Sequence, residues 1–134
     1  MKPPILVAED EPPLRSMLAL ILESEGYLVQ QARHGGEAVS FLSQGTEQPR
    51  ILILDLLMPV FTGTQVLEWL SQQPSLRQQT RIIVLSGIGE IPPAIMALSD
   101  HAIAKPFNVD HLLKSIIQQT TALQRQTQLV EVPE

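Results

Sequence analysis

The sequence predicts an α/β protein with a doubly wound, five-stranded parallel sheet covered by helices on both faces. Short apolar runs such as 5–8, 51–54 and 82–85 lack the polar alternation of a half-exposed strand. Such runs are typical of strands buried between two layers of helices. Segments with a helical spacing of apolar residues separate these runs, so that strand and helix alternate along the chain as they do in a parallel sheet.

The central element is the run 51–54, which follows Pro49 and ends in the carboxylate of Asp55. Pro59 prevents regular pairing from continuing. Ligands of open parallel sheets bind beyond the carboxyl ends of the strands, so Asp55 lies where such a fold performs its chemistry. Taken alone, Asp55 is equally compatible with a simple turn residue, because aspartate is common in turns.

The N-terminal strand is expected over 5–8 and leads into three consecutive acids, Glu9, Asp10 and Glu11. The prolines at 12–13 then open a helix, where a missing N–H is tolerated. Capping that helix uses one acid, so three exceed the need. The helix has one apolar face and is followed by Gly26 as its cap; the face consists of Leu14, Met17, Leu18, Ile21 and Leu22.

The middle of the chain continues the alternation. We expect, in order, a strand over 27–31, a turn at 34–36, a helix over 37–42, a polar loop over 44–49, the central strand, a helix that begins at 62–63, and a glutamine-rich loop over 71–80. Val66, Leu67 and Leu70 form the buried side of the helix after 62–63. Trp69 falls off that stripe, so its side chain should be partly exposed.

The last third repeats the pattern twice. We expect a strand over 81–85 that ends at Ser86 and Gly87, a short helix over 94–98 after Pro92 and Pro93, a strand over 102–104 that ends in Lys105 and Pro106, and a helix over about 109–123. The apolar stripe of that helix is Val109, Leu112, Leu113, Ile116 and Ile117. We expect residues 4–123 to form one domain and the polar segment 124–134 to be a flexible tail.

Composition limits the class of function. The 134 residues suit one domain, and 44% hydrophobic with 17% charged residues indicates a globular chain. The net charge of −5 gives no support to direct nucleic-acid binding, and the absence of cysteine excludes thiolate metal sites. The sequence shows no secretory signal and no membrane span of roughly 18 apolar residues. We therefore expect a cytoplasmic protein that does not contact a membrane.

Polar groups follow four of the predicted strands: Glu9 and Asp10, then Asp55, Ser86 and Lys105. A parallel sheet brings these ends to one edge, where three carboxylates repel each other and need a counter-charge. Mg²⁺ binds carboxylates together with water and phosphate oxygens, while the lysine and the serine suit a tetrahedral anion. This constellation predicts phosphoryl transfer with Asp55 as the acceptor. Each group alone has an ordinary explanation as a cap, a turn residue or a solvated lysine, but their coincidence favours one function.

Several of these segments together resemble the receiver domain of two-component response regulators, and in particular the single-domain chemotaxis-type receivers. The segments are 5–11, the His34-Gly35-Gly36-Glu37-Ala38 run, Asp55-Leu56-Leu57-Met58-Pro59 with Gly63, Val84-Leu85-Ser86-Gly87 and Ala104-Lys105-Pro106-Phe107. They occur in the family's order and cover about residues 4–123. The resemblance implies a flavodoxin-like sheet with strand order 2-1-3-4-5.

The resemblance also implies roles for individual residues. Asp55 would receive a phosphoryl group from a histidine kinase or a histidine-phosphotransfer protein, and the chain would control an output partner as a signalling phosphoacceptor rather than as an enzyme. Mg²⁺ would be bound by Asp10, Asp55 and the backbone carbonyl of Leu57, with Glu9 acting through water. Ser86 and Lys105 would hold the phosphoryl oxygens, and the bond between Lys105 and Pro106 would be cis.

The sequence departs from the family pattern at three positions. Glu9 stands where aspartate is commoner, Ser86 replaces the more usual threonine, and Ala102 occupies a position that usually carries tyrosine or phenylalanine. The interval from Ser86 to Lys105 is also a few residues shorter than usual and contains Pro92 and Pro93. This altered region keeps open a second hypothesis, that of a receiver fold used as a phosphorylation-independent docking or dimerisation module. A third hypothesis is a Mg²⁺-dependent phosphohydrolase with an aspartyl nucleophile. Leu57 argues against it, because that class usually carries an acid two residues after the nucleophile.

Overall fold

The computed structural model describes residues 2–45, 48–87 and 91–131, with side chains up to Gln126. The elements occur in the order β1 (Ile5–Ala8), α1 (Pro12–Ser24), β2 (Val29–Ala32), α2 (Gly35–Gln44), β3 (Arg50–Asp55), α3 (Gly63–Ser71), α4 (Pro74–Gln78), β4 (Thr80–Ser86), α5 (Pro93–Leu98), β5 (His101–Ala104) and α6 (Val109–Glu131). None of the described helices is long and apolar enough to cross a membrane.

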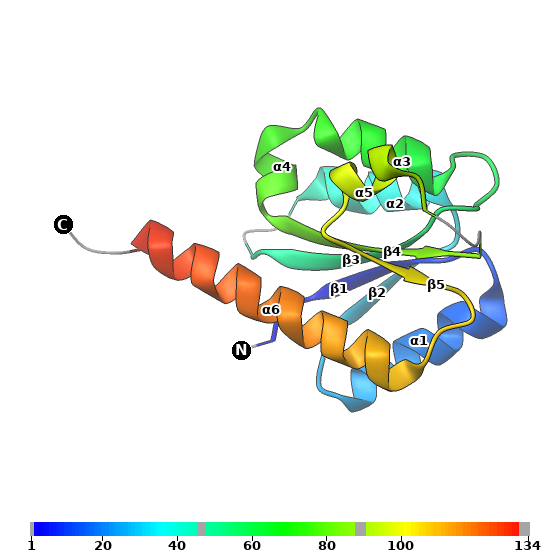
Figure 1. Cartoon of the computed structure of the whole chain (residues 1–134), viewed down its shortest axis with the longest axis horizontal. Helices are drawn as coiled ribbons and strands as arrows, with labels where there is room; N and C mark the ends of the chain where they lie inside the picture. The colour runs from blue at the N-terminus through cyan, green and yellow to red at the C-terminus, as the bar shows by residue number, and fades with distance from the viewer. Residues whose placement is uncertain (1, 46–47, 88–90, 132–134) are drawn as a thin grey trace.

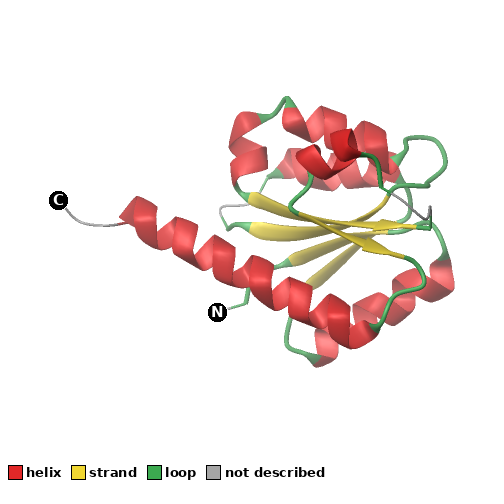
Figure 2. Cartoon of the chain, viewed as in Figure 1, coloured by secondary structure: helices red, strands yellow, loops and turns green. Residues whose placement is uncertain are grey.

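The five strands form one parallel sheet in the order β2-β1-β3-β4-β5, as predicted. The register pairs Ala8 with Leu54 and Asp55 with Leu85, so that the carboxyl ends of the central strands lie side by side. Helices cover both faces of the sheet, with α1 and α6 on one side and α2, α3, α4 and α5 on the other (Figures 1 and 2).

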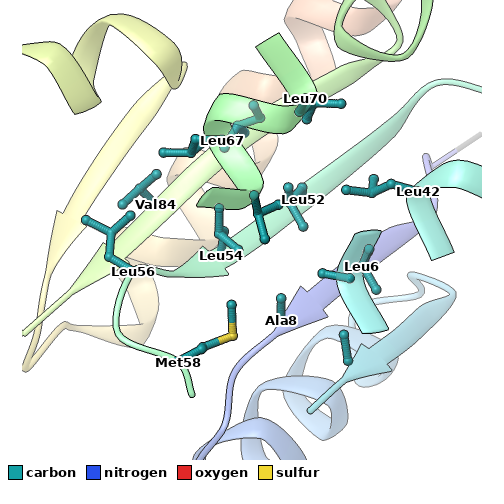
Figure 3. Close-up of a cluster of buried hydrophobic side chains, with 14 residues drawn as sticks. Leu6, Ala8, Leu42, Leu52, Leu54, Leu56, Met58, Leu67, Leu70 and Val84 are labelled. Carbon is teal, nitrogen blue, oxygen red and sulfur yellow. The ribbon is translucent and has the colours of Figure 1, made fainter. Parts of the chain in front are cut away.

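The core consists of two apolar layers, one on each face of the sheet, because successive side chains of a strand point to opposite faces. Leu6, Leu52 and Leu54 pack under α2 and α3; Figure 3 shows Leu52 and Leu54 near Leu67, and Leu6 near Leu42. The residues that alternate with them along β1 and β3 pack on the other face against α1 and α6; they include Ile5, Val7, Ile51 and Ile53. The strands are therefore buried on both sides, which explains their continuous apolar sequences.

Three sequence-based expectations differ from the structure. The predicted loop over 71–80 contains a short helix, α4, which begins at Pro74 and buries no residue, so it has no apolar stripe to reveal it. The final helix does not end near Leu123 but continues to Glu131, and the amide of Gln126 donates a hydrogen bond to the carbonyl of Gln78. Met17 and Ile117, placed on the apolar stripes of α1 and α6, are 40% and 59% exposed.

Most other expectations are confirmed, with shifts of a few residues. The second strand begins at Val29 instead of residue 27, α2 begins at Gly35 instead of residue 37, and α5 begins at Pro93. Trp69 is half-buried against the core, as predicted, and the peptide bond between Lys105 and Pro106 is cis. Within the predicted loop after Gly87, residues 88–90 lie outside the described part of the chain.

Candidate functional site

The candidate site lies at the carboxyl ends of the central strands. Glu9 and Asp10 directly follow β1, Asp55 is the last residue of β3, Ser86 is the last residue of β4, and Lys105 follows β5. The parallel register aligns these ends, because Ala8 pairs with Leu54 and Ser86 pairs with Ala104. The sheet therefore brings together residues that lie far apart in the sequence.

Three carboxylates form the acidic part of the site. Glu9 is fully buried, Asp55 is 2% exposed and Asp10 is half-buried, and one carboxylate oxygen from each lies within 4.8 Å of the others. A cluster of carboxylate oxygens at this separation fits a hard divalent cation such as Mg²⁺, which binds oxygen ligands and retains water. The sheet thus brings Glu9, Asp10 and Asp55 together, as predicted, and their role as magnesium ligands stays a prediction.

Lys105 supplies the positive charge within the cluster. Its Nζ atom lies 2.8 Å from Oε1 of Glu9 and 3.5 Å from Oδ2 of Asp55. The pKa of Glu9 is raised to about 7, mainly by burial; the hydrogen bond from Lys105 lowers this pKa, and the neighbouring Asp55 raises it. For Lys105, burial lowers the pKa, but Glu9, Asp55 and Glu11 outweigh burial and raise it overall, so the side chain remains an ammonium ion at neutral pH.

Backbone contacts hold the remaining predicted residues beside Asp55. The backbone N–H of Leu57 donates to Oδ1 of Asp55 at 3.2 Å, while the leucine side chain is 57% exposed. Ser86 is fully buried, and its carbonyl accepts a hydrogen bond from the backbone N–H of Lys105 at 2.7 Å. The loop after β3 and the end of β4 are thereby held next to the carboxylates.

Two residues support the site in ways that the sequence analysis did not identify. Arg15 of α1 donates from Nη1 to the carbonyl of Glu9 at 2.9 Å, which fixes the end of β1. Gly63 begins α3 so close to Asp55 that a Cβ atom at this position would lie 2.2 Å from the Asp55 carbonyl oxygen. In the sequence, a glycine at the start of the helix after β3 could have indicated this close approach. Apart from its position one turn after Glu11, nothing in the sequence indicated the contact of Arg15.

The chain is similar to known proteins. A family model described as the response regulator receiver domain matches residues 5–117. Transcriptional regulatory protein TcrA from Mycobacterium tuberculosis is 33% identical over 111 residues, which cover 81% of this chain and 42% of TcrA. Phosphate regulon transcriptional regulatory protein PhoB from Escherichia coli is 30% identical over 115 residues, covering 84% of this chain and 49% of PhoB. The chain thus spans less than half the length of these two relatives.

The fold also matches solved structures. The crystal structure of response regulator TrrA from Thermotoga maritima in complex with Mg²⁺ and BeF superimposes with a TM-score of 0.76 at 29% identity, covering 88% of this chain and 98% of TrrA. The family model matches most of the chain and agrees with the strand order and the acidic cluster. The chain therefore belongs to the response regulator receiver domain family, the phosphoacceptor modules of two-component systems.

Proposed function

We propose that Asp55 accepts a phosphoryl group from the phosphohistidine of a histidine kinase or a histidine-phosphotransfer protein, in a Mg²⁺-dependent reaction that controls an output partner. The observation that carries this proposal is the position of Lys105, whose Nζ atom lies 3.5 Å from Oδ2 of Asp55. A nearly buried carboxylate with an ammonium group beside it is suited to receive a phosphoryl group, because the cation offsets charge on the incoming oxygens.

The transfer step balances without a further reactant. A carboxylate oxygen of Asp55 attacks phosphorus, an O–P bond forms and the P–N bond to the donor imidazole breaks. The departing imidazole nitrogen keeps the electron pair of that bond and takes up a proton. Lys105 would hold a phosphoryl oxygen as charge develops, and Ser86, at the end of the neighbouring strand, would supply a hydroxyl donor to another oxygen.

The metal ligands of this chain would be Glu9, Asp10, Asp55 and the carbonyl of Leu57. When bound, Mg²⁺ would neutralise negative charge on the phosphoryl oxygens. Glu9 is buried and paired with Lys105, whereas Asp10 lies at the more exposed side of the cluster. This difference supports Asp10 as a direct ligand and Glu9 as a residue that acts through water.

The experiment is phosphorylation by acetyl phosphate with Mg²⁺, followed by intact mass measurement. We expect the mass of one phosphate to be added to the wild type and to be absent from Asp55→Asn. Asp110→Asn, which changes an exposed aspartate of α6, is the matched control and should be labelled like the wild type. A label that survives in Asp55→Asn would contradict the assignment of Asp55.

Two observations favour a second candidate function, a docking or dimerisation module that works without phosphorylation. Ala102 of β5 has no side chain able to change rotamer, and α5 buries no residue. Wild-type protein that binds Mg²⁺ but takes no phosphate from acetyl phosphate or from a phosphohistidine donor would support this alternative over the phosphoacceptor function.

A further inference from the structure

Two of the chain's three histidines face each other away from the acidic site. His101 is the first residue of β5 and His111 lies in the first turn of α6, and the centroids of their rings are 6.0 Å apart. The ring planes are tilted by 37° to each other. Both side chains line a hollow of about 570 Å³ between β5 and α6. The acidic site, in contrast, lies beyond the carboxyl end of β5.

One ring nitrogen of His101 has no hydrogen-bond partner among the described residues. This atom, Nε2, is buried. Buried polar atoms nearly always have a partner, so an orphan nitrogen on a residue that lines this hollow requires an explanation. Burial, and to a lesser degree the nearby His111, lower the pKa of His101, which keeps the imidazole neutral at pH 7. A neutral imidazole is the form that binds a metal ion.

We propose that His101 and His111 together bind one borderline transition-metal ion of the Zn²⁺ or Ni²⁺ type, with water completing the coordination. Imidazole suits these ions, whereas the carboxylate cluster suits Mg²⁺. An ion about 2.1 Å from a nitrogen of each ring would require the rings to approach by less than about 1 Å. The exposed ring of His111 can rotate toward His101, because His111 lies at the surface of α6.

The charges around the hollow are balanced. Asp110 and Lys114 of α6 both line it, so a carboxylate favours a cation there and an ammonium group opposes it. Asn108 also lines the hollow, but its side-chain oxygen already accepts the backbone N–H groups of Asp110 and His111. The metal would link β5 directly to α6, and it would hold in place the segment between them, which contains Lys105.

The first test uses the wild-type chain and nuclear magnetic resonance of its histidine rings. Zn²⁺ is added in the presence of excess Mg²⁺, which occupies the carboxylate cluster. We expect the ring signals of His101 and His111 to shift together and to saturate at one equivalent, while His34, the N-cap of α2, stays unchanged. Unchanged signals of His101 and His111, or a shift of His111 alone, would overturn the proposal.

The second test measures Zn²⁺ affinity by calorimetry under the same conditions. His101→Gln and His111→Gln should each weaken binding at least about tenfold. His34→Asn, which keeps an N-cap side chain on α2, is the matched control and should bind like the wild type. Lys114→Gln should strengthen binding, since it removes the opposing charge. Binding that survives in His111→Gln but is lost in Asp10→Asn would place the ion in the carboxylate cluster and overturn the proposal.

Discussion

The Nζ atom of Lys105 lies 2.8 Å from Oε1 of Glu9, a fully buried carboxylate at the end of β1. This contact joins residues that are 96 positions apart in the sequence and ties the segment after β5 to the end of β1. The same Nζ atom lies 3.5 Å from Oδ2 of Asp55. One ammonium group thus compensates two carboxylates at the edge of the sheet where the candidate site lies.

The first prediction concerns Lys105→Met, which keeps a long apolar side chain and removes the charge. We expect the rate of Asp55 phosphorylation by acetyl phosphate to fall by roughly 100-fold, a typical loss for one electrostatic donor at a reacting oxygen. The fold should persist, because Glu9, whose pKa is raised to about 7, can take up a proton when its partner is lost. Time-resolved intact mass measures the rate, and circular dichroism checks the fold.

The matched control for this prediction is Lys114→Met, which removes an exposed ammonium group of α6. Its phosphorylation rate should equal that of the wild type. A rate for Lys105→Met close to the wild-type rate would show that the ammonium group does not act on the phosphoryl oxygens.

The second prediction ranks the two acids that follow β1. Asp10→Asn should weaken Mg²⁺ binding more than Glu9→Gln does, because Glu9 is already paired with Lys105 and Asp10 lies on the more exposed side. Removing either charge should also relieve repulsion among the carboxylates, so both variants should unfold at higher temperature without Mg²⁺. Calorimetric Mg²⁺ titrations measure the ranking, and equal affinities for the two variants would refute it.

The third prediction concerns acid stability and the pair formed by Arg33 and Glu37. Hydrogen bonds from the Arg33 side chain and backbone lower the pKa of Glu37 to about 2. A carboxyl group whose pKa is lower in the folded state stabilises the fold above its unfolded value of 4.5, and this contribution disappears as the pH falls toward 2. Glu37→Gln should therefore lose less stability than the wild type between pH 4.5 and pH 2.

Urea unfolding at a series of pH values measures how much the free energy of unfolding falls as the pH is lowered. Glu68→Gln, at an exposed position of α3, is the matched control and should lose stability with acid as the wild type does. Parallel curves for the wild type and Glu37→Gln would mean that the pair contributes nothing to stability.

The fourth prediction concerns Val60 in the loop after β3. Its φ angle is 69°, a left-handed conformation in which a β-branched side chain is strained, and the side chain is 87% exposed. Val60→Gly relieves that strain and loses no buried contact, so it should raise the free energy of unfolding by up to about 1 kcal/mol. Ser40→Gly, on an exposed position of α2, should instead lower it, because glycine weakens a helix. Equal losses in the two variants would contradict the strain argument.

Much of the fold was predictable because the strands are buried on both faces. The continuous apolar runs marked β1, β3 and β4, and the polar residues at their ends marked the site. What the sequence did not reveal depends on tertiary contacts. The helix α4 buries no residue, and the end of α6 is polar, so neither carries a periodic apolar signal.

The same distinction holds within the candidate site. Glu9, Asp10, Asp55 and Lys105 could be grouped from the sequence, since parallel strands align their carboxyl ends. The ion pair of Lys105 with Glu9 and the bond from Arg15 to the Glu9 carbonyl could not be derived. They depend on how the segment after β5 and the first turns of α1 pack around the end of β1, which no local pattern encodes.

The last prediction concerns the response to phosphorylation. Ala102 stands where the family usually has an aromatic side chain, and alanine has no side chain that could alternate between two rotamers. If the chain switches, another segment must therefore adopt the two states. The helix α5 is short, opens with prolines and buries no residue, which are features of a segment that shifts at low cost. We expect a beryllofluoride mimic with Mg²⁺ to change amide hydrogen exchange mainly over residues 87–101, of which 88–90 lie outside the described residues. Trp69, half-buried on α3, should report little of this change.

Asp55→Asn, which lacks the acceptor carboxylate, is the control and should show no change with the mimic. Protection changes that centre on α3 and spare residues 87–101 would refute the prediction. If the wild type binds the mimic and no segment changes, the docking-module function gains support, because a ligand that binds two states equally cannot shift their populations.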